Sequence, residues 1–211
     1  MNIIIIGPQG SGKGTQANKI SAAQHIPHIS SGDLFRDNIK KQTELGRIAQ
    51  QYINQGKLVP DDVTDSMVRE RLRNEDCGKG FILDGYPRNV KQVQSLMNIV
   101  HIDCVLDLEI SDEEALERIT GRRICAECGK GYHINFVRPK IEGHCDVCEG
   151  ELIQRSDDEP EAIIKRLEIY HEQTKPLLDF FKERGMLRIV NGSQSVEEVF
   201  KDITIKLKRN I

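Results

Sequence analysis

Nine residues near the start of the chain, Gly7–Thr15, have the sequence G-P-Q-G-S-G-K-G-T and could bind phosphate. They follow the run Asn2–Ile6, which predicts a strand buried on both faces, and they precede a predicted helix. In that context glycines let successive backbone N–H groups turn toward an anion, and the helix N-terminus adds a positive field. Lys13 would contact the transferred phosphate group. We therefore predict a phosphate loop rather than a glycine-rich turn with an exposed lysine.

One position departs from the general phosphate-loop pattern. Gly14 follows Lys13 where a serine or threonine is expected, and Thr15 comes one residue later. Direct binding of magnesium by that hydroxyl is therefore a weaker expectation. Asp84 ends an apolar strand predicted over Gly80–Asp84, which would place it at the carboxyl edge of a sheet beside the loop. Asp84 could hold magnesium, directly or through water, or simply cap a helix; Asp107 is a weaker rival.

Four cysteines form a second candidate centre. Their pattern is two Cys-x-x-Cys pairs separated by 16 residues, at Cys125, Cys128, Cys145 and Cys148. This spacing is typical of a tetrathiolate zinc site, and four thiolates leave no open position for a reacting water. We therefore predict a structural zinc ion, and a reduced or disulfide-linked set without metal is the alternative.

Other cysteines and histidines carry weaker signals. Cys77 and Cys104 lie alone and are expected to be small apolar core residues. His133 and His144 lie near the four cysteines, but with four thiolates present each is expected to be a surface residue. The stretch between the two pairs has few apolar residues, so a metal would replace the missing core.

Composition narrows the function classes. The chain has 211 residues and a formal net charge of -3, which argues against a polybasic nucleic-acid binder. Met1–Gly7 is far shorter than the roughly 20 apolar residues of a membrane span, and it has no cationic start. We expect a cytoplasmic protein, in which thiols stay reduced and paired cysteines indicate metal.

Strand and helix patterns alternate along the chain, which predicts a parallel α/β sheet. Two stretches, about 30–59 and 121–158, interrupt this alternation and are interpreted as inserted lobes. After the second lobe we expect one long helix over Asp158–Glu183, with Pro160 in its first turn. Asp157 and Asp158 could cap that helix or assist in binding magnesium.

Arginines are the last clue, because planar guanidinium forks suit the charge of phosphoryl transfer. Together with the phosphate loop they form five motifs that occur in order along the chain: G-P-Q-G-S-G-K-G-T at 7–15, S-S-G-D-L-F-R at 30–36, D-G-Y-P-R at 84–88, T-G-R-R at 120–123 and Q-R-S-D-D at 154–158. On these motifs the chain resembles the adenylate kinases of the long, lidded bacterial type. The resemblance covers nearly the whole chain.

The resemblance implies a phosphate-loop nucleoside monophosphate kinase fold. Its core would be a five-stranded parallel sheet formed by 1–29, 60–120 and 159–211, carrying two mobile lobes. Residues 30–59 would bind AMP, and residues 121–158 would form a zinc-binding lid. The implied reaction is the reversible transfer ATP + AMP = 2 ADP with Mg²⁺, by direct in-line attack, in a monomer that binds neither nucleic acid nor membrane.

The resemblance also implies roles for individual residues, carried over motif by motif. The catalytic cations would be Lys13, Arg88, Arg122, Arg155 and Arg166. ATP would contact Gly10, Ser11, Gly12, Lys13, Gly14, Thr15, Arg122, Gly131, Tyr132 and Gln194. AMP would contact Ser31, Arg36, Lys57, Leu58, Val59, Gly85, Tyr86, Pro87, Arg88, Gln92, Arg155 and Arg166. Ser31 stands where the family commonly has threonine, and Gln92 would contact the adenine edge.

Three other functions remain open at this point. A hydrolase or nucleotide switch could use the same phosphate loop, but no residue is evident that would position an attacking water. A zinc-ribbon nucleic-acid binder is disfavoured because Lys130, Arg138 and Lys140 are interspersed with acidic residues. A kinase for a different monophosphate is the third alternative. Ser31 and Gln92 favour AMP over other monophosphates only by resemblance to the family.

Overall fold

The computed structural model describes residues 1–54, 59–155 and 158–208. The strands are β1 (Asn2–Ile6), β2 (His28–Ser30), β3 (Phe81–Asp84), β4 (Cys104–Glu109), β5 (Arg122–Cys125), β6 (Gly131–His133), β7 (Leu152–Ile153) and β8 (Leu187–Asn191). The helices are α1 (Lys13–Gln24), α2 (Ser31–Lys40), α3 (Glu44–Asn54), α4 (Asp61–Leu72), α5 (Val90–Met97), α6 (Asp112–Thr120), α7 (Pro160–Ile169), α8 (Leu177–Glu183) and α9 (Val196–Lys208). A 3₁₀ turn, η1 (Glu75–Lys79), and a π-helical turn, η2 (Tyr170–Thr174), complete the described elements.

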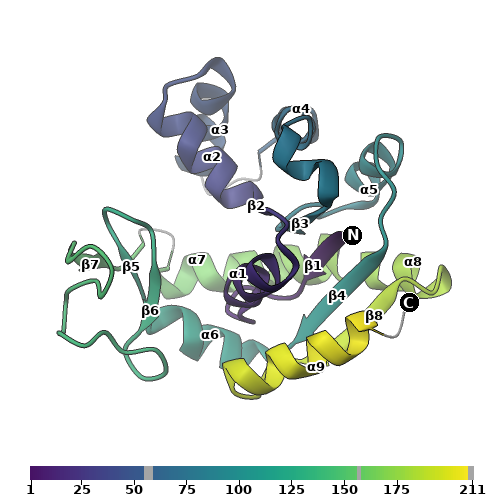
Figure 1. The fold of residues 1–211 in the computed structure, drawn as a ribbon. Coiled ribbons are helices and arrows are strands. Elements are labelled where there is room, and N and C mark those ends of the chain that lie inside the picture. Colours follow the sequence, from purple (N-terminus) through teal and green to yellow (C-terminus); the bar gives the residue numbers. More distant parts are fainter. Residues whose placement is uncertain (55–58, 156–157, 209–211) are drawn as a thin grey trace.

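Five strands form the central sheet in the order β2-β3-β1-β4-β8, and every neighbouring pair is parallel. This confirms the predicted five-stranded parallel α/β core. β1 lies in the middle, and its isoleucines alternate between the two faces: Ile4 and Ile6 belong to one apolar cluster, and Ile3 and Ile5 to the other. The first face is covered by α4, α5 and α8, and the second by α1 and α9 (Figure 1).

The register of the sheet sets the position of the candidate site. Ile5 of β1 pairs with Asp84 of β3, and Ile6 pairs with Asp107 of β4. The segment that follows β1 is Gly7–Thr15, so the phosphate loop and both aspartates meet at the carboxyl edge of the sheet. In open parallel sheets this edge is where ligands bind.

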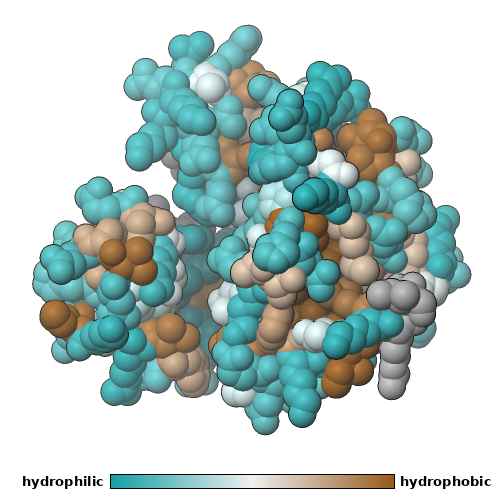
Figure 2. Space-filling model, in the orientation of Figure 1, coloured by the Kyte–Doolittle hydropathy of each residue, from teal (hydrophilic) through white to brown (hydrophobic). Residues whose placement is uncertain are grey.

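The stretch between α6 and α7 forms its own small sheet, with antiparallel pairing in the order β6-β5-β7. We call residues 121–158 the lid. Figure 2 shows it as a body of its own, with a hollow between it and the rest of the molecule on that face. The helices α2 and α3 pack on each other and project from the core at the other side of this hollow (Figure 1).

The long helix predicted over 158–183 is confirmed as a helical stretch from Pro160 to Glu183, but it is not one regular α-helix. The chain forms α7, then the π-helical turn η2, and then α8 after Pro176. The N–H of Lys175 donates to the carbonyl of Tyr170 at 2.8 Å, five residues back. The physical reason lies in Pro176, which has no N–H to donate, so the hydrogen-bond ladder shifts there while the backbone of Lys175 and Pro176 stays in the right-handed helical region. In the part of the chain that is described, no helix combines the length and the apolar composition needed to cross a membrane.

Candidate active site

The phosphate loop is shaped by glycine backbone. Gly10 and Gly12 have φ angles of 83° and 87°, which favour glycine, and Gly12 precedes the first residue of α1. A Cβ on Gly10 would lie 2.8 Å from the carbonyl oxygen of Ala115, so α6 packs directly on the loop. The Nζ of Lys13 folds back over this loop and donates to the carbonyl oxygens of Gly7 and Pro8 at 2.8 and 2.7 Å. The ammonium is thus held against the loop, beside the position that a bound phosphate would occupy.

The surroundings of Lys13 change the pKa of its ammonium group. Burial lowers its pKa from 10.5 to about 8, because desolvation disfavours the ammonium form. Asp84 opposes this shift, whereas the nearby charges of Arg88, Arg166 and Arg122 add to it. Arginines from three separate segments of the chain therefore lie near the Lys13 ammonium. Such a concentration of positive charge is expected of a site for a highly charged anion.

Asp84 lies beside the loop as predicted. A Cβ built on Gly14 would be 3.6 Å from its Oδ2, so the glycine at this variant position faces the carboxylate. Burial would raise the pKa of Asp84, but His28, Lys13 and Arg88 lower it below its ordinary value. The Nε2 of His28 lies 3.4 Å from Asp84 Oδ2. A charged carboxylate at this place suits a hard cation such as magnesium.

Asp107, the rival carboxylate, differs in its environment. Its side chain is fully buried in β4, and burial raises its pKa to about 7. Within the described residues neither of its carboxylate oxygens has a hydrogen-bond partner. The neutral form is therefore favoured far more than at Asp84, and Asp84 is the better cation ligand.

Asp158 joins two of the predicted catalytic arginines. Its carboxylate is fully buried and accepts from Arg122 through both oxygens, one of them at 2.8 Å from Arg122 Nε. Arg166 Nη1 lies 3.6 Å from the same carboxylate. The capping role considered for Asp158 does not occur, because Glu159 precedes α7 and provides no side-chain cap. Arg155 lies at the end of the lid, three residues before Asp158, and Asp157 lies outside the described residues.

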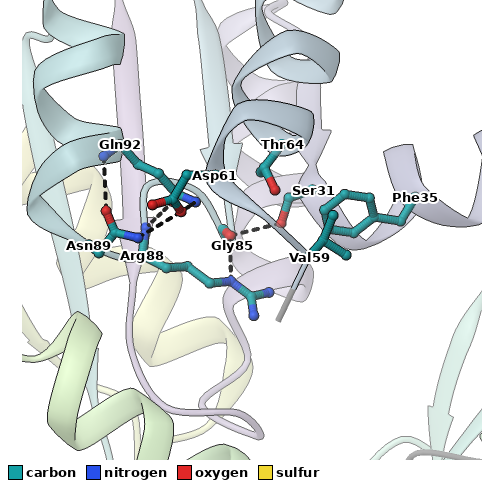
Figure 3. Close-up of a pocket in the computed structure, with 9 residues that line it drawn as sticks. All are labelled: Ser31, Phe35, Val59, Asp61, Thr64, Gly85, Arg88, Asn89 and Gln92. Carbon is teal, nitrogen blue, oxygen red and sulfur yellow. Dashed lines mark hydrogen bonds between the residues drawn. The ribbon is translucent and has the colours of Figure 1, made fainter. Parts of the chain in front are cut away.

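The acceptor pocket, as we call the second part of the site, is built around one carbonyl group (Figure 3). The carbonyl oxygen of Gly85 accepts from Ser31 Oγ at 2.8 Å and from Arg88 Nε at 2.7 Å. Gly85 has a φ of 75°, and a Cβ there would lie 2.8 Å from Ser31 Oγ. The two predicted AMP contacts are thus tied together, and the remaining N–H groups of Arg88 stay available for an anion.

Further side chains line this acceptor pocket: Phe35, Val59, Asp61, Thr64, Asn89 and Gln92. The predicted AMP residues Val59 and Gln92 are therefore brought to Ser31 and Arg88. Arg36, from α2, pairs with Asp33 one turn earlier on the same helix. Two other predicted contacts, Lys57 and Leu58, lie outside the described residues.

Tyr86 and Pro87, two predicted AMP contacts, belong to the D-G-Y-P-R turn. Neither is among the described residues that line the acceptor pocket. Tyr86 is buried and donates to Asp65 Oδ1 at 2.7 Å, so its hydroxyl joins the turn to α4. Burial raises the pKa of this hydroxyl, which therefore stays neutral. Pro87 follows a cis peptide bond.

Two predicted ATP contacts have side chains engaged elsewhere. Gln194 Nε2 donates to the carbonyl of Asn191 and to Asp202 Oδ2 at 3.2 and 3.0 Å. Tyr132 is buried in the lid, where its hydroxyl accepts from the N–H of Asp146 at 2.7 Å. A contact from Tyr132 to ATP would therefore come from its backbone, next to the exposed Gly131.

The four cysteines meet in the lid. All four Sγ atoms lie within 4.8 Å of one another. The Cys125–Cys148 and Cys128–Cys145 pairs have Sγ separations of 3.4 and 3.5 Å, and all four thiols are free. Zinc with ligands at about 2.3 Å in a tetrahedron requires sulfurs about 3.8 Å apart, whereas a disulfide requires about 2 Å. The arrangement fits a tetrathiolate metal site and not a pair of disulfides.

Hydrogen bonds prepare one of these thiols for a metal. Burial alone would raise the pKa of Cys145, but donors from Tyr132 and from the backbone of Val147 and Cys148 lower it to about 6. The Tyr132 hydroxyl lies 3.4 Å from Cys145 Sγ. Because thiolates are the metal-binding form, these donors favour binding.

Comparison with known proteins agrees with the site. The profile of the adenylate kinase family matches residues 5–186. The chain belongs to the adenylate kinase family. It is 50% identical over 208 residues to the adenylate kinase of Thermoanaerobacter sp. (strain X514), a match that covers 96% of both chains. It is 49% identical over 215 residues to the adenylate kinase of Clostridium botulinum (strain 657 / Type Ba4), covering all of both chains.

One expectation for this adenylate kinase family member is wrong. His133 was expected at the surface, but it is buried, and its Nδ1 accepts from the N–H groups of Asn135 and Phe136 at 3.0 and 3.2 Å. His133 therefore closes a turn of the lid and is not in the sulfur cluster. Cys77 and Cys104 are buried, as predicted for small core residues.

Three residues of the site were missed in the sequence. His28 contacts Asp84, Arg118 donates to the carbonyl of Gly192 at 3.0 Å behind the phosphate loop, and Asp61 contacts Gln92 in the acceptor pocket. Asp61 is the first residue of α4, and an acidic residue in that position is typical of a helix N-terminus, so nothing in the sequence separately indicated its contact with Gln92. The pairing of β2 beside β3, which brings His28 to Asp84, follows from the topology and not from local sequence.

Proposed function

We propose that this protein is an adenylate kinase that catalyses the reversible, Mg²⁺-dependent transfer ATP + AMP = 2 ADP, and thereby serves adenine nucleotide homeostasis and AMP salvage. The observation that carries this proposal is the convergence of Lys13, Arg88, Arg122 and Arg166 between a phosphate loop and a second pocket. One phosphate-binding element with one acceptor pocket suits two nucleotides. Membership of the adenylate kinase family supports the same conclusion.

ATP would bind at the phosphate loop, with its phosphates on the N–H groups of 10–15. Lys13 would exchange its contacts with Gly7 and Pro8 for the phosphates, and Arg122 would contact them from the lid. The backbone of Gly131 and Tyr132 and the side chain of Gln194 would complete this site, although Gln194 would have to leave Asp202.

AMP would bind in the acceptor pocket. Its phosphate would contact Arg36 and Arg88, with Arg155 and Arg166 bridging toward the phosphate of ATP. Its base would lie against Val59, facing Gln92. Ser31 would take the place of the family's usual threonine, and its hydroxyl is already fixed to the Gly85 carbonyl.

Transfer would be direct, since the phosphate oxygen of AMP can attack the terminal phosphorus of ATP in line. Lys13 and the arginines would stabilise the charge that spreads over the transferred group. Closure of the lid over the hollow would exclude water, which is a competing acceptor. No residue needs to form a covalent intermediate.

Two metals fit the residues present. Mg²⁺ would be held near ATP by Asp84 through water, and it would neutralise phosphate charge. Zn²⁺ would be held by the four lid cysteines as a structural ion with a closed coordination sphere. The division of the chain into an AMP-binding lobe at 30–59, a lid at 121–158 and a core is part of this proposal, and the separate sheet of the lid supports it.

We also propose a monomer in the cytoplasm that binds small molecules. The net charge of -3 and the mixed charges of the lid disfavour a nucleic-acid surface. A zinc-ribbon reader would instead need a basic stripe along that lobe. Reduced thiols, as in the cytoplasm, are compatible with a tetrathiolate site.

A product assay tests the proposal. Purified protein is incubated with ATP, Mg²⁺ and one monophosphate at a time, and ADP and inorganic phosphate are both quantified. We expect two ADP for each AMP consumed, with little free phosphate. Release of phosphate without AMP would instead identify a hydrolase, and faster transfer to another monophosphate would reassign the acceptor.

A further inference from the structure

The side-chain amide of Gln92 is held at both of its ends (Figure 3). Its Oε1 accepts from the backbone N–H of Arg88 at 2.7 Å, and its Nε2 donates to Asp61 Oδ1 at 2.7 Å. A backbone N–H can only donate, and a carboxylate can only accept. Rotating the amide by half a turn would place donor against donor and acceptor against acceptor. The network therefore fixes which end of Gln92 is the oxygen.

Asp61 is itself firmly placed. It is the first residue of α4, and the same Oδ1 also accepts from Asn89 Nδ2 at 2.8 Å. Asn89 in turn caps α5, because its Oδ1 accepts from the N–H of Gln92 at 3.0 Å. Gln92 is only 4% exposed, so water competes weakly for these bonds. One carboxylate thus connects the starts of two helices with the amide of Gln92.

Each end of the Gln92 amide keeps one further hydrogen-bonding position. An amide oxygen has two lone pairs and an amide nitrogen has two hydrogens, and the contacts above use one of each. The remaining pair is an acceptor beside a donor. This pair matches a 6-aminopurine, whose amino group donates and whose N1 accepts. It opposes a 6-oxopurine, whose O6 accepts and whose N1–H donates.

We infer that Asp61 is a specificity-determining residue, which orients Gln92 so that the acceptor pocket prefers a 6-aminopurine monophosphate over a 6-oxopurine monophosphate. The inference rests on the proposed function and deepens it. Asp61 acts through Gln92 and need not touch the nucleotide, so it is a positioning residue. A site that presents fixed polar partners rejects the mismatched base because those partners are then left unpaired.

The test compares AMP with inosine monophosphate, which differs at position 6 and N1 of the base. Rates of ADP formation are measured with saturating ATP for the wild type and for Asp61→Ala. We expect the ratio of kcat/KM for AMP to that for inosine monophosphate to fall about tenfold or more in Asp61→Ala, on the scale of one charge-assisted hydrogen bond. The change should lie mainly in KM for the monophosphate, and KM for ATP should stay the same.

Two matched variants isolate the effect. Asp61→Asn keeps an oxygen acceptor at the position of Oδ1, so it should retain most of the preference. Asp62→Asn removes a charge from the same first turn of α4, but Asp62 is exposed and should leave the ratio unchanged. If Asp61→Ala does not fold, Asp61→Ser carries the same expectation, because its hydroxyl is too short to reach Gln92.

Two results would overturn the inference. Equal losses with AMP and inosine monophosphate in a folded Asp61→Ala variant would assign Asp61 a purely structural role. Equal kcat/KM for AMP and inosine monophosphate in the wild-type protein would also overturn the inference, because there would be no preference for Asp61 to determine. A wild type that forms no ADP from ATP and AMP would overturn the proposed function itself, which separates the two failures.

Discussion

The phosphate loop and the lid are positioned by different means. The loop follows β1, whose side chains lie in two large apolar clusters, and α6 packs directly on its glycines. The apolar cluster of the lid consists of Cys125, Tyr132 and Cys145 with Leu152 packed beside them. Two of these four residues are candidate metal ligands. A buried sheet therefore positions the phosphate loop, whereas the described part of the lid has only a small cluster in which the candidate metal ligands gather.

Large apolar side chains of the lid are exposed at its surface. Phe136, Ile141 and Val147 are 61%, 68% and 66% exposed, so the apolar residues that the lid does have are not gathered into a core. A lobe of this size cannot bury enough apolar area to fold on that basis alone. Metal binding can supply the missing free energy of folding. We therefore predict that changes in the chemistry and changes in the stability of the lid can be produced by different variants.

The largest effect is expected at Lys13. In Lys13→Met we predict a fall in kcat of roughly a thousandfold, because the ammonium that would stabilise the transferred phosphate is lost. The melting temperature should not fall, since the variant removes a desolvated charge. Steady-state ADP formation and a thermal melt measure the two quantities.

Lys19→Met is the matched control for this variant. Lys19 lies on the same helix, and it pairs with Glu197 at the surface. Surface pairs contribute little, so activity and stability should both stay close to the wild type. Near-normal turnover in Lys13→Met would contradict the assignment of Lys13 to the phosphates.

The next effect is expected at Gly85. In Gly85→Ala the new Cβ would lie 2.8 Å from Ser31 Oγ and would sit on a backbone with φ of 75°. We predict an increase of about tenfold in KM for AMP, the factor that about 1.4 kcal/mol gives, with KM for ATP unchanged. Gly78→Ala is the control, because nothing lies within 4 Å of a Cβ there. Equal changes in both KM values would mean that Gly85 does not belong to the acceptor pocket alone.

A smaller effect is expected from pH. Burial lowers the pKa of Lys13 to about 8, so the charged form is lost as the pH rises through that value. We predict that kcat/KM for ATP falls about fourfold between pH 7 and 8.5, because this parameter reports the free enzyme. Phosphates bound to Lys13 would raise its pKa again, so kcat should fall less over the same range.

Lys13→Arg provides the control for the pH profile. A guanidinium stays charged over the whole range, so the decline above pH 8 should disappear even if the rate itself is lower. A decline that persists unchanged in Lys13→Arg would assign the titration to another group.

The sequence predicted what depends on local pattern. The glycines and the strand before them predicted the loop, and the spacing of the cysteines predicted a cluster that the fold indeed forms. Contacts between segments that are distant in the sequence could not be predicted from local patterns. Asp158 was interpreted as a helix cap or a weaker magnesium ligand, but its carboxylate accepts from Arg122, which lies 36 residues earlier in the chain. The π-helical turn before Pro176 was missed because a proline inside a helical pattern does not reveal how the backbone hydrogen bonds shift, here to a bond from the Lys175 N–H to the carbonyl of Tyr170.

The lid side of the comparison is tested by Cys125→Ser, which should have the smallest effect on the chemistry. Cys125 Sγ lies among the other three sulfurs, and the N–H of Cys128 donates to it at 3.5 Å. Loss of one thiolate should abolish stoichiometric zinc, measured by atomic emission on the purified protein. Destabilisation by about 2–3 kcal/mol would lower the melting temperature by about 5–10 °C.

Activity of Cys125→Ser at low temperature should stay within about twofold of the wild type, since a closed four-sulfur site offers no position for substrate. Cys77→Ala is the control: it removes a buried thiol that lies outside the sulfur cluster, so zinc should remain stoichiometric. If zinc loss abolished activity while circular dichroism and proteolysis reported a fully folded lid, the metal would take part in the chemistry. The separation between a lid held by sulfur and a loop held by the sheet would then fail.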